Sequence, residues 1–190
     1  MALVFPLLLG LAVSPLLGGR WSLLGQLRLR ALPVFYLAFA LQLAAFPTSH
    51  MPWRTPDSIA VALWLASYAL FVVALARNTR VPGTPLVAAG LVSNVCAIVA
   101  NRGHMPALPS ALRAAGLHFT STDRNSAVLV HPHLPWLVDR WAAPQWLPWA
   151  NVFSVGDVLI AGGGLVFALV ATQAFRRRPR AGDPEPLSVG

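Results

Sequence analysis

The sequence predicts an all-α, polytopic membrane protein in which about five transmembrane helices form a bundle. Three observations favour this class. Hydrophobic residues make up 56% of the 190-residue chain and charged residues only 11%, whereas soluble domains contain ~25% charged residues. The hydrophobic residues gather in long runs, and arginines flank those runs.

Five apolar runs are candidates for the spans, because each approaches the ~17–25 residues that cross the hydrocarbon as a helix. They lie near residues 3–17, 32–46, 58–76, 85–100 and 152–175. The first is the shortest and contains Pro6 and Pro15. No basic residue precedes it and no small-residue cleavage site follows it, which favours a retained span over a cleaved signal peptide.

Residues 1–178 are therefore interpreted as a single membrane domain. The proline-containing residues 179–190 are predicted to be a disordered cytoplasmic tail.

Arginine placement predicts the orientation. Nine of the fourteen basic residues lie in the loop 18–31, the loop 77–84 and the tail, which share one side if five helices alternate. The positive-inside rule puts this side in the cytoplasm, with the N-terminus outside and the C-terminus inside. The net charge of +8 needs no nucleic-acid partner, since no basic surface alternates with aromatic residues.

The outer loop 101–150, before the last span, is rich in tryptophan and proline and is longer than a connection requires. Its tryptophans predict segments that lie at the level of the lipid headgroups; they are Trp136, Trp141, Trp146 and Trp149. A short helix is expected at Ser110–Ala115, ending at Gly116, and an extended piece at Ser126–Val130.

Two aspartates, Asp139 and Asp157, are expected at the outer membrane face at similar depth. Each has a structural explanation of its own. Ser154 and Asp157 fit the Ser-x-x-acid capping box at the start of the last span, and Asp139 could pair with Arg140 or another arginine.

Together the two acids suggest a catalytic site. Two carboxyl groups in one low-dielectric cleft cannot both ionise, so one pKa rises. One acid then acts as general base on water and the other as general acid, as in aspartic peptidases. We expect Ser154 and Asn101 to orient the acids, with Asn151 and Arg102 in supporting positions. Asn94, within the fourth span, could bond across helices or orient a carboxylate.

The segment Phe153-Ser154-Val155-Gly156-Asp157 resembles the FNxAD segment of lipoprotein signal peptidases, and Leu137-Val138-Asp139 resembles their VVDF segment. The pair Asn101-Arg102 matches part of their GNxxDR segment. This resemblance implies that Asp139 and Asp157 form a catalytic dyad at the outer membrane surface, acting on a lipid-anchored polypeptide. The chain departs from the pattern at Ser154, where that family has Asn, and in the short loop 47–57.

A second resemblance covers more of the chain. The segments 101–106, 137–139 and 151–157 resemble the NGGxMP, LGD and NVFSIGD stretches of an uncharacterised family of small bacterial integral membrane proteins. Arg102 stands where that family usually has Gly. This resemblance implies a multi-pass protein of the bacterial inner membrane and names no activity.

Other functions stay open. His131 and His133, with His104 and Asp139, could offer ligands to zinc, but the spacing does not demand a metal. We therefore predict no metal or other cofactor. A non-enzymatic membrane subunit that binds lipid or a partner protein is the main alternative, with Asp157 only a helix cap. Transport is less favoured, because no span carries a charge near its middle. The expected partners are membrane lipids and a lipid-anchored or membrane-embedded polypeptide substrate.

Overall fold

The computed structural model describes residues 5–47, 53–117, 126–129, 131–145 and 151–175, and most of them are helical. The predicted all-α class is confirmed at this level. In chain order the elements are α1 (Phe5–Val13), the 3-10 helices η2 (Ser14–Leu17) and η3 (Trp21–Gln26), α2 (Leu32–Ala45), α3 (Asp57–Ala76), α4 (Thr84–Ala100), β1 (Met105–Ala107), α5 (Pro109–Ala115), β2 (Ser126–Val128), β3 (Trp141–Ala142), β4 (Val152–Phe153) and α6 (Val155–Ala171).

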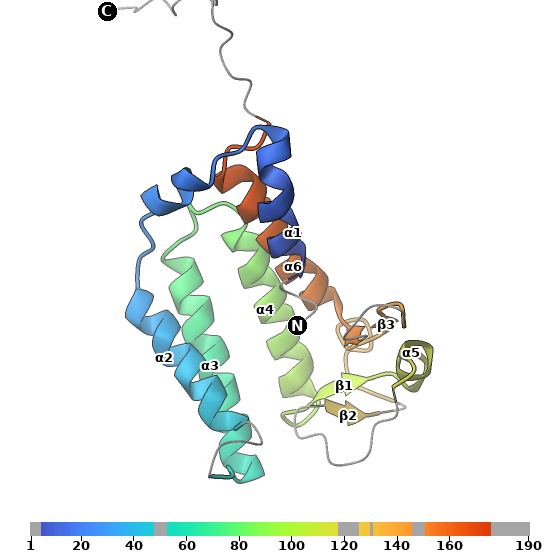
Figure 1. Cartoon of the computed structure of the whole chain (residues 1–190). Helices are drawn as coiled ribbons and strands as arrows, with labels where there is room; N and C mark the ends of the chain where they lie inside the picture. The colour runs from blue at the N-terminus through green and yellow to red at the C-terminus, as the bar shows by residue number, and fades with distance from the viewer. Residues whose placement is uncertain (1–4, 48–52, 118–125, 130, 146–150, 176–190) are drawn as a thin grey trace, which may run out of the picture.

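The five apolar helices pack in the spatial order α2, α3, α4, α6 and α1 (Figure 1). One end of this bundle, uppermost in Figure 1, holds η2, η3 and the turn between α3 and α4. We call it the arginine end. The four strands and α5 lie at the opposite end, which we call the strand end (Figure 1).

One helix, α3, is long and apolar enough to cross a membrane, among the residues that the structure describes. The other apolar helices have 10–17 residues; they are Phe5–Leu17, Leu32–Ala45, Thr84–Ala100 and Val155–Ala171. The number of spans therefore stays a prediction. The predicted tail at 179–190 lies outside the described residues.

The last predicted span, 152–175, is too long at both ends. Val152 and Phe153 form β4, because Ser154 takes the extended backbone of an N-cap residue and the helix begins after it. Helix α6 ends at Ala171, and Gln173 and Phe175 adopt φ angles of 57° and 73°. Such positive φ angles are incompatible with a continuing right-handed helix.

The strand end consists of two small sheets and one short helix. Strands β1 and β2 pair in parallel, β3 and β4 pair in antiparallel fashion, and α5 packs against β3 and β4. The predicted helix at 110–115 is confirmed as α5, with Gly116 as its left-handed C-cap. The extended piece predicted at Ser126–Val130 is confirmed over Ser126–Val128, and Val130 lies outside the described residues.

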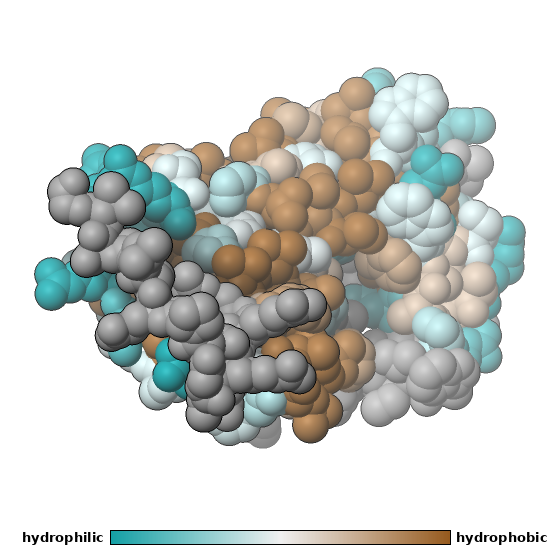
Figure 2. Space-filling model, turned by 90° about the horizontal axis from the view of Figure 1, so that it is seen from above, coloured by the Kyte–Doolittle hydropathy of each residue, from teal (hydrophilic) through white to brown (hydrophobic). Residues whose placement is uncertain are grey.

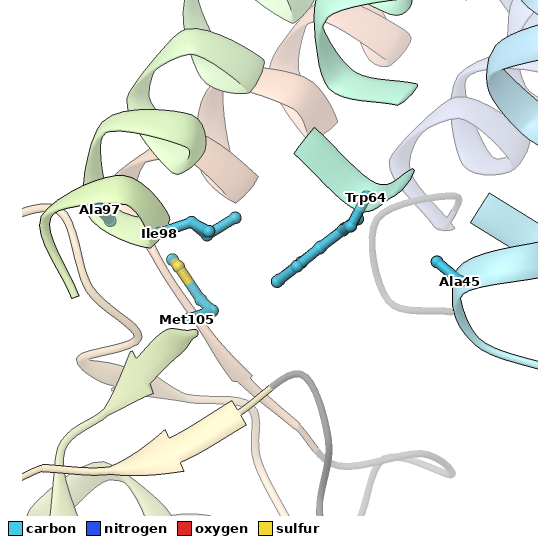
Figure 3. Close-up of a cluster of buried hydrophobic side chains, with 5 residues drawn as sticks. All are labelled: Ala45, Trp64, Ala97, Ile98 and Met105. Carbon is cyan, nitrogen blue, oxygen red and sulfur yellow. The ribbon is translucent and has the colours of Figure 1, made fainter. Parts of the chain in front are cut away.

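A buried cluster joins three of the helices to the strand end (Figure 3). It consists of Ala45, Trp64, Ala97, Ile98 and Met105. The Trp64 indole extends from α3 toward Ile98 on α4 and Met105 on β1 (Figure 3). These contacts fix β1 against the ends of α3 and α4, and they thereby position the candidate site described below.

The outer surface of the helices is markedly apolar. Figure 2, which looks from above onto the arginine end, shows hydrophobic residues across the middle of this view, with hydrophilic residues grouped toward the left and right edges. Large hydrophobic side chains more than half exposed on the α-helices are Phe5, Leu8, Tyr36, Leu37, Phe39, Ile59, Val99 and Val170.

Candidate active site

The first turn of α6 carries one of the two aspartates. Ser154 is the N-cap residue, and its Oγ accepts a hydrogen bond of 3.1 Å from the Asp157 backbone N–H. In return, Asp157 Oδ2 accepts a bond of 3.1 Å from the Ser154 N–H. The predicted capping box is therefore confirmed, and it fixes the direction in which the Asp157 carboxyl group points.

A residue from the neighbouring helix holds the other oxygen of this carboxyl group. Asn94, buried on α4, donates from Nδ2 to Asp157 Oδ1 at 3.0 Å. Its Oδ1 accepts a bond of 2.9 Å from Ser154 Oγ. The Asp157 carboxyl group thus accepts one hydrogen bond from the Asn94 side chain on α4 and one from the backbone N–H of Ser154, its N-cap residue.

Glycines allow α4 and α6 to approach closely enough for these bonds. A Cβ atom on Gly156 would collide with the Asn94 side chain, and a Cβ atom on Gly90 would collide with the Gly156 carbonyl. Small residues at a helix contact permit this close backbone approach. The glycines at 90 and 156 therefore position Asn94 against the first turn of α6.

Asp139 reaches the site from the outer loop through backbone pairing. Its N–H donates to Pro106 O and its carbonyl accepts from the Leu108 N–H, both at 2.9 Å. Asp139 forms a parallel bridge with Ala107 of β1, and the preceding Val138 is completely buried. Strand β1 therefore holds the Asp139 backbone in register on the edge opposite β2.

Asp139 and Asp157 line one polar cavity of about 140 Å³. The remaining wall comes from α3, α4 and β1, namely Trp64, Tyr68, Asn94, Ile98 and Met105. Asp139 is only 8% exposed, and its Oδ1 is buried without a hydrogen-bond partner among the described residues. The two acids that the sequence singles out thus meet on one cavity.

The electrostatics of Asp139 follow from this placement. Burial, and after it the charge of Asp157, raises the pKa of Asp139 from 3.8 to about 8. A carboxyl group loses hydration on burial and is repelled by a second carboxylate, and both effects favour the protonated form. At neutral pH the cavity therefore contains a protonated Asp139 that can donate a hydrogen bond.

Arg140, which the sequence offered as one possible partner of Asp139, contacts Trp141 instead. The Arg140 guanidinium lies over the Trp141 ring, with 5.5 Å between Cζ and the ring centroid. Arg140 is exposed, whereas Asp139 is buried. The arginine therefore does not neutralise the acid.

A second hollow, of about 380 Å³, adjoins Asp157 and is almost entirely apolar. Its wall includes Pro6 of α1 and Val158, Ala161, Gly162 and Leu165 of α6. Asp157 lines both this apolar hollow and the polar cavity. Asp157 thus lies between a hollow that could hold an apolar group of a ligand and a cavity that could hold water.

One family model matches this chain, over residues 26–170. The chain belongs to the DUF5317 family, a family of unknown function. The match includes both aspartates and all three segments whose resemblance to an uncharacterised family is noted above. No curated protein matches, and no solved structure matches.

The supporting residues of this DUF5317 protein differ in where they lie. Ser154 contacts Asp157 as expected. Asn101 instead clamps the outer loop: its Nδ2 donates to His133 O at 2.9 Å, and its Oδ1 accepts from the His133 N–H at 2.8 Å. An asparagine amide matches the donor and acceptor of one backbone residue. Asn101 therefore fixes the loop and makes no such bond to either acid.

Asn151 and Arg102 lie away from the polar cavity. Asn151 lines the apolar hollow and accepts a hydrogen bond of 2.9 Å from the Val152 N–H. Arg102 is exposed in a turn, with a φ angle of 59°. Among the described residues no group of three His, Cys, Asp or Glu side chains could hold a metal ion.

The polar cavity also contains Asn94, which the sequence indicated could bond across helices or orient a carboxylate, and further residues outside the predicted site. Asn94 contacts Asp157 directly, and an asparagine inside an apolar run is the sequence signal for it. Tyr68, one turn after Trp64 on α3, gives a similar signal, because its hydroxyl group is polar and the surrounding helix is apolar. Trp64 and Met105 carry no such signal, because each also suits an ordinary core.

Proposed function

We propose that this protein is an integral membrane hydrolase that cleaves an amide bond with Asp139 and Asp157 as its catalytic dyad. The observation that carries this proposal is the 140 Å³ cavity lined by both Asp139 and Asp157, together with the buried Asp139 Oδ1, which has no hydrogen-bond partner in the part of the chain that the structure describes. Structural carboxyl groups are normally hydrogen-bonded when buried. A buried carboxyl group without a hydrogen-bond partner, beside a second acid, is suited to be a proton donor whose hydrogen-bond acceptor is the bound substrate.

The apolar exterior supports a membrane location. Large hydrophobic side chains stand exposed on all five apolar helices, where lipid rather than water would be a favourable neighbour. In the proposed orientation the strand end lies at the outer face of a bacterial inner membrane and the arginine end faces the cytoplasm. Some of the helices are short for the ~30 Å hydrocarbon, so local thinning or flanking 3-10 segments would complete the crossing.

In the proposed reaction Asp157 is the general base and Asp139 the general acid. Asp157 takes a proton from a water molecule as the water oxygen attacks the scissile carbonyl carbon. Asp139 gives its proton to the carbonyl oxygen, which yields a neutral tetrahedral diol. Proton transfer from the Asp157 carboxyl to the amide nitrogen then breaks the C–N bond, and Asp139 recovers its proton from the diol.

The two hollows match the needs of this reaction. Liquid water occupies ~30 Å³ per molecule, so the polar cavity has room for the attacking water and the scissile group. The apolar hollow on the other side of Asp157 suits an apolar side chain or acyl chain that enters from the lipid. The proposed substrate class is therefore a membrane-embedded or lipid-anchored polypeptide.

The test compares Asp139→Asn, Asp157→Asn and the double variant in cells of the native host that lack the chromosomal gene. New polypeptide termini in the membrane fraction, identified by mass spectrometry, should be restored by the wild type alone. Residues that act as one unit are strongly non-additive, so the double variant should be no worse than either single variant. Identical sets of termini with and without the wild-type protein would refute the proposal.

The capping box favours one competing function, a non-enzymatic subunit that binds lipid or a partner protein. It gives Asp157 a sufficient structural role at a helix start. It gives none to the buried Asp139 carboxyl group, which makes the hydrolase the better-supported proposal. If Asp139→Asn leaves function intact while Asp157→Asn lowers only protein stability, the subunit function is favoured instead.

A further inference from the structure

A third hollow lies at the arginine end, away from both aspartates. Its volume is about 690 Å³. Two segments meet around it: the linker between η3 and α2, and the turn between α3 and α4 (Figure 1). Together these segments contribute four arginines, Arg28, Arg30, Arg77 and Arg80.

A buried asparagine joins the two segments. Asn78 accepts a hydrogen bond of 2.8 Å from the Arg30 N–H and donates one of 2.8 Å to Arg30 O. Its second N–H donates to Ala74 O in the last turn of α3. The backbone of the linker is thereby fixed against the end of α3, so the arginines of both segments are held together before any ligand arrives.

The positive charge in this hollow is uncompensated among the described residues. No described carboxyl group lines it, and Asp57, Asp139 and Asp157 all belong to the strand end. The four arginines are exposed, so their guanidinium groups can reach a ligand. Guanidinium groups bind phosphate oxygens bidentately, and several around one hollow make a strong anion site.

We propose that this hollow binds the phosphate group of an anionic membrane phospholipid. A lipid fits better than free phosphate because exposed apolar side chains flank the arginines. Leu29 stands between Arg28 and Arg30, and Val73 lies one turn before Arg77; they are 42% and 46% exposed. These side chains can contact the acyl chains while the arginines hold the headgroup. This inference depends on the proposed membrane location and is independent of the aspartate dyad.

The experiment measures lipid binding by the purified full chain in a neutral detergent. Short-chain phosphatidylglycerol, phosphatidylcholine of equal chain length, and inorganic phosphate are titrated separately, and the melting temperature is followed. Each arginine near an anionic surface contributes roughly a fivefold gain in affinity. The double variant Arg30→Gln/Arg77→Gln should therefore bind phosphatidylglycerol about 25-fold more weakly.

The matched control is Arg20→Gln/Arg113→Gln, which removes the same charge from two arginines outside the hollow. It should bind phosphatidylglycerol like the wild type. If the Arg30/Arg77 variant does not fold, Arg80→Gln, in the exposed turn, should still show the fivefold loss.

Equal weakening in the control would overturn the proposal, because it would mean a general charge effect. Stabilisation by inorganic phosphate as strong as that by phosphatidylglycerol would replace the lipid with free phosphate as the ligand. Because binding is read without catalysis, loss of activity in Asp139→Asn leaves this test unaffected.

Discussion

Asn94 on α4 donates a hydrogen bond of 3.0 Å to the Asp157 carboxyl group on α6. The bond spans 63 positions of the sequence and links two helices at the depth where the polar cavity opens. The same asparagine accepts from Ser154, so it orients both residues of the capping box. Its removal should affect the packing of the helices and the position of the proposed base.

Asn94→Ala should lower the free energy of unfolding by about 1–3 kcal/mol, because it removes a hydrogen-bond partner from the buried Ser154 hydroxyl and from the partly buried Asp157 carboxyl group. Unfolding in detergent measures this loss. Cys96→Ala is the matched control, since Cys96 is exposed two positions further along the same helix; its effect should stay within about 0.5 kcal/mol. Equal losses for the two variants would mean that the Asn94 bonds contribute nothing specific.

The raised pKa of Asp139 predicts how stability depends on pH. The folded protein holds the Asp139 proton up to a pKa of about 8, whereas the unfolded chain releases it near pH 4. Between these values the folded state binds more protons, so stability falls as pH rises, by at most about 1.4 kcal/mol per pH unit. The contribution is fully present below pH 4 and lost above pH 8.

Asp139→Asn removes this group and should flatten the decline in melting temperature between pH 5 and pH 8. Other titrating groups are common to both proteins, so the difference between the two pH profiles isolates Asp139. Parallel profiles would show that Asp139 does not carry its proton at neutral pH.

Asp157→Asn tests whether the two acids interact. The Asp157 charge is the second cause of the raised pKa of Asp139, after burial. Removing that charge should therefore lower the pKa of Asp139 but leave it above its ordinary value. Infrared titration of the protonated carboxyl band, assigned with Asp139→Asn, measures the change. An unchanged midpoint would mean that the two carboxyl groups do not sense each other, contrary to a dyad.

The parts of this site that the sequence could predict are local. The capping box needs only Ser154 and Asp157, three residues apart, and the helix α5 needs only its own residues and Gly116. Both predictions depend on hydrogen bonds within one turn. They are confirmed without any knowledge of the rest of the fold.

The convergence of the two aspartates depends on distant contacts. Asp139 reaches the cavity because its backbone pairs with Pro106 and Leu108 on the edge of β1, and no periodicity in a loop predicts that pairing. Asn101 shows the same limit in reverse. Its position at the end of the fourth predicted span suggested a contact with the acids, but the donor and the acceptor of its amide both bond to the backbone of His133.

Two adjacent glycines in α6 give a test of the helix packing. A Cβ atom on Gly163 would lie 2.6 Å from Val87 Cγ2 and 2.7 Å from Gly83 O, whereas one on Gly162 would have no atom within 4 Å. Gly163→Ala should therefore force α4 and α6 apart and cost about 1–3 kcal/mol. Gly162→Ala should be neutral or stabilise by up to ~1 kcal/mol, because alanine favours the helix. Both variants add one methyl group to the same turn, so the difference between their free energies of unfolding in detergent reports the contact of residue 163 with α4. If Gly163→Ala is as stable as Gly162→Ala, the close approach of α4 to α6 is wrong, and with it the bond from Asn94 to Asp157.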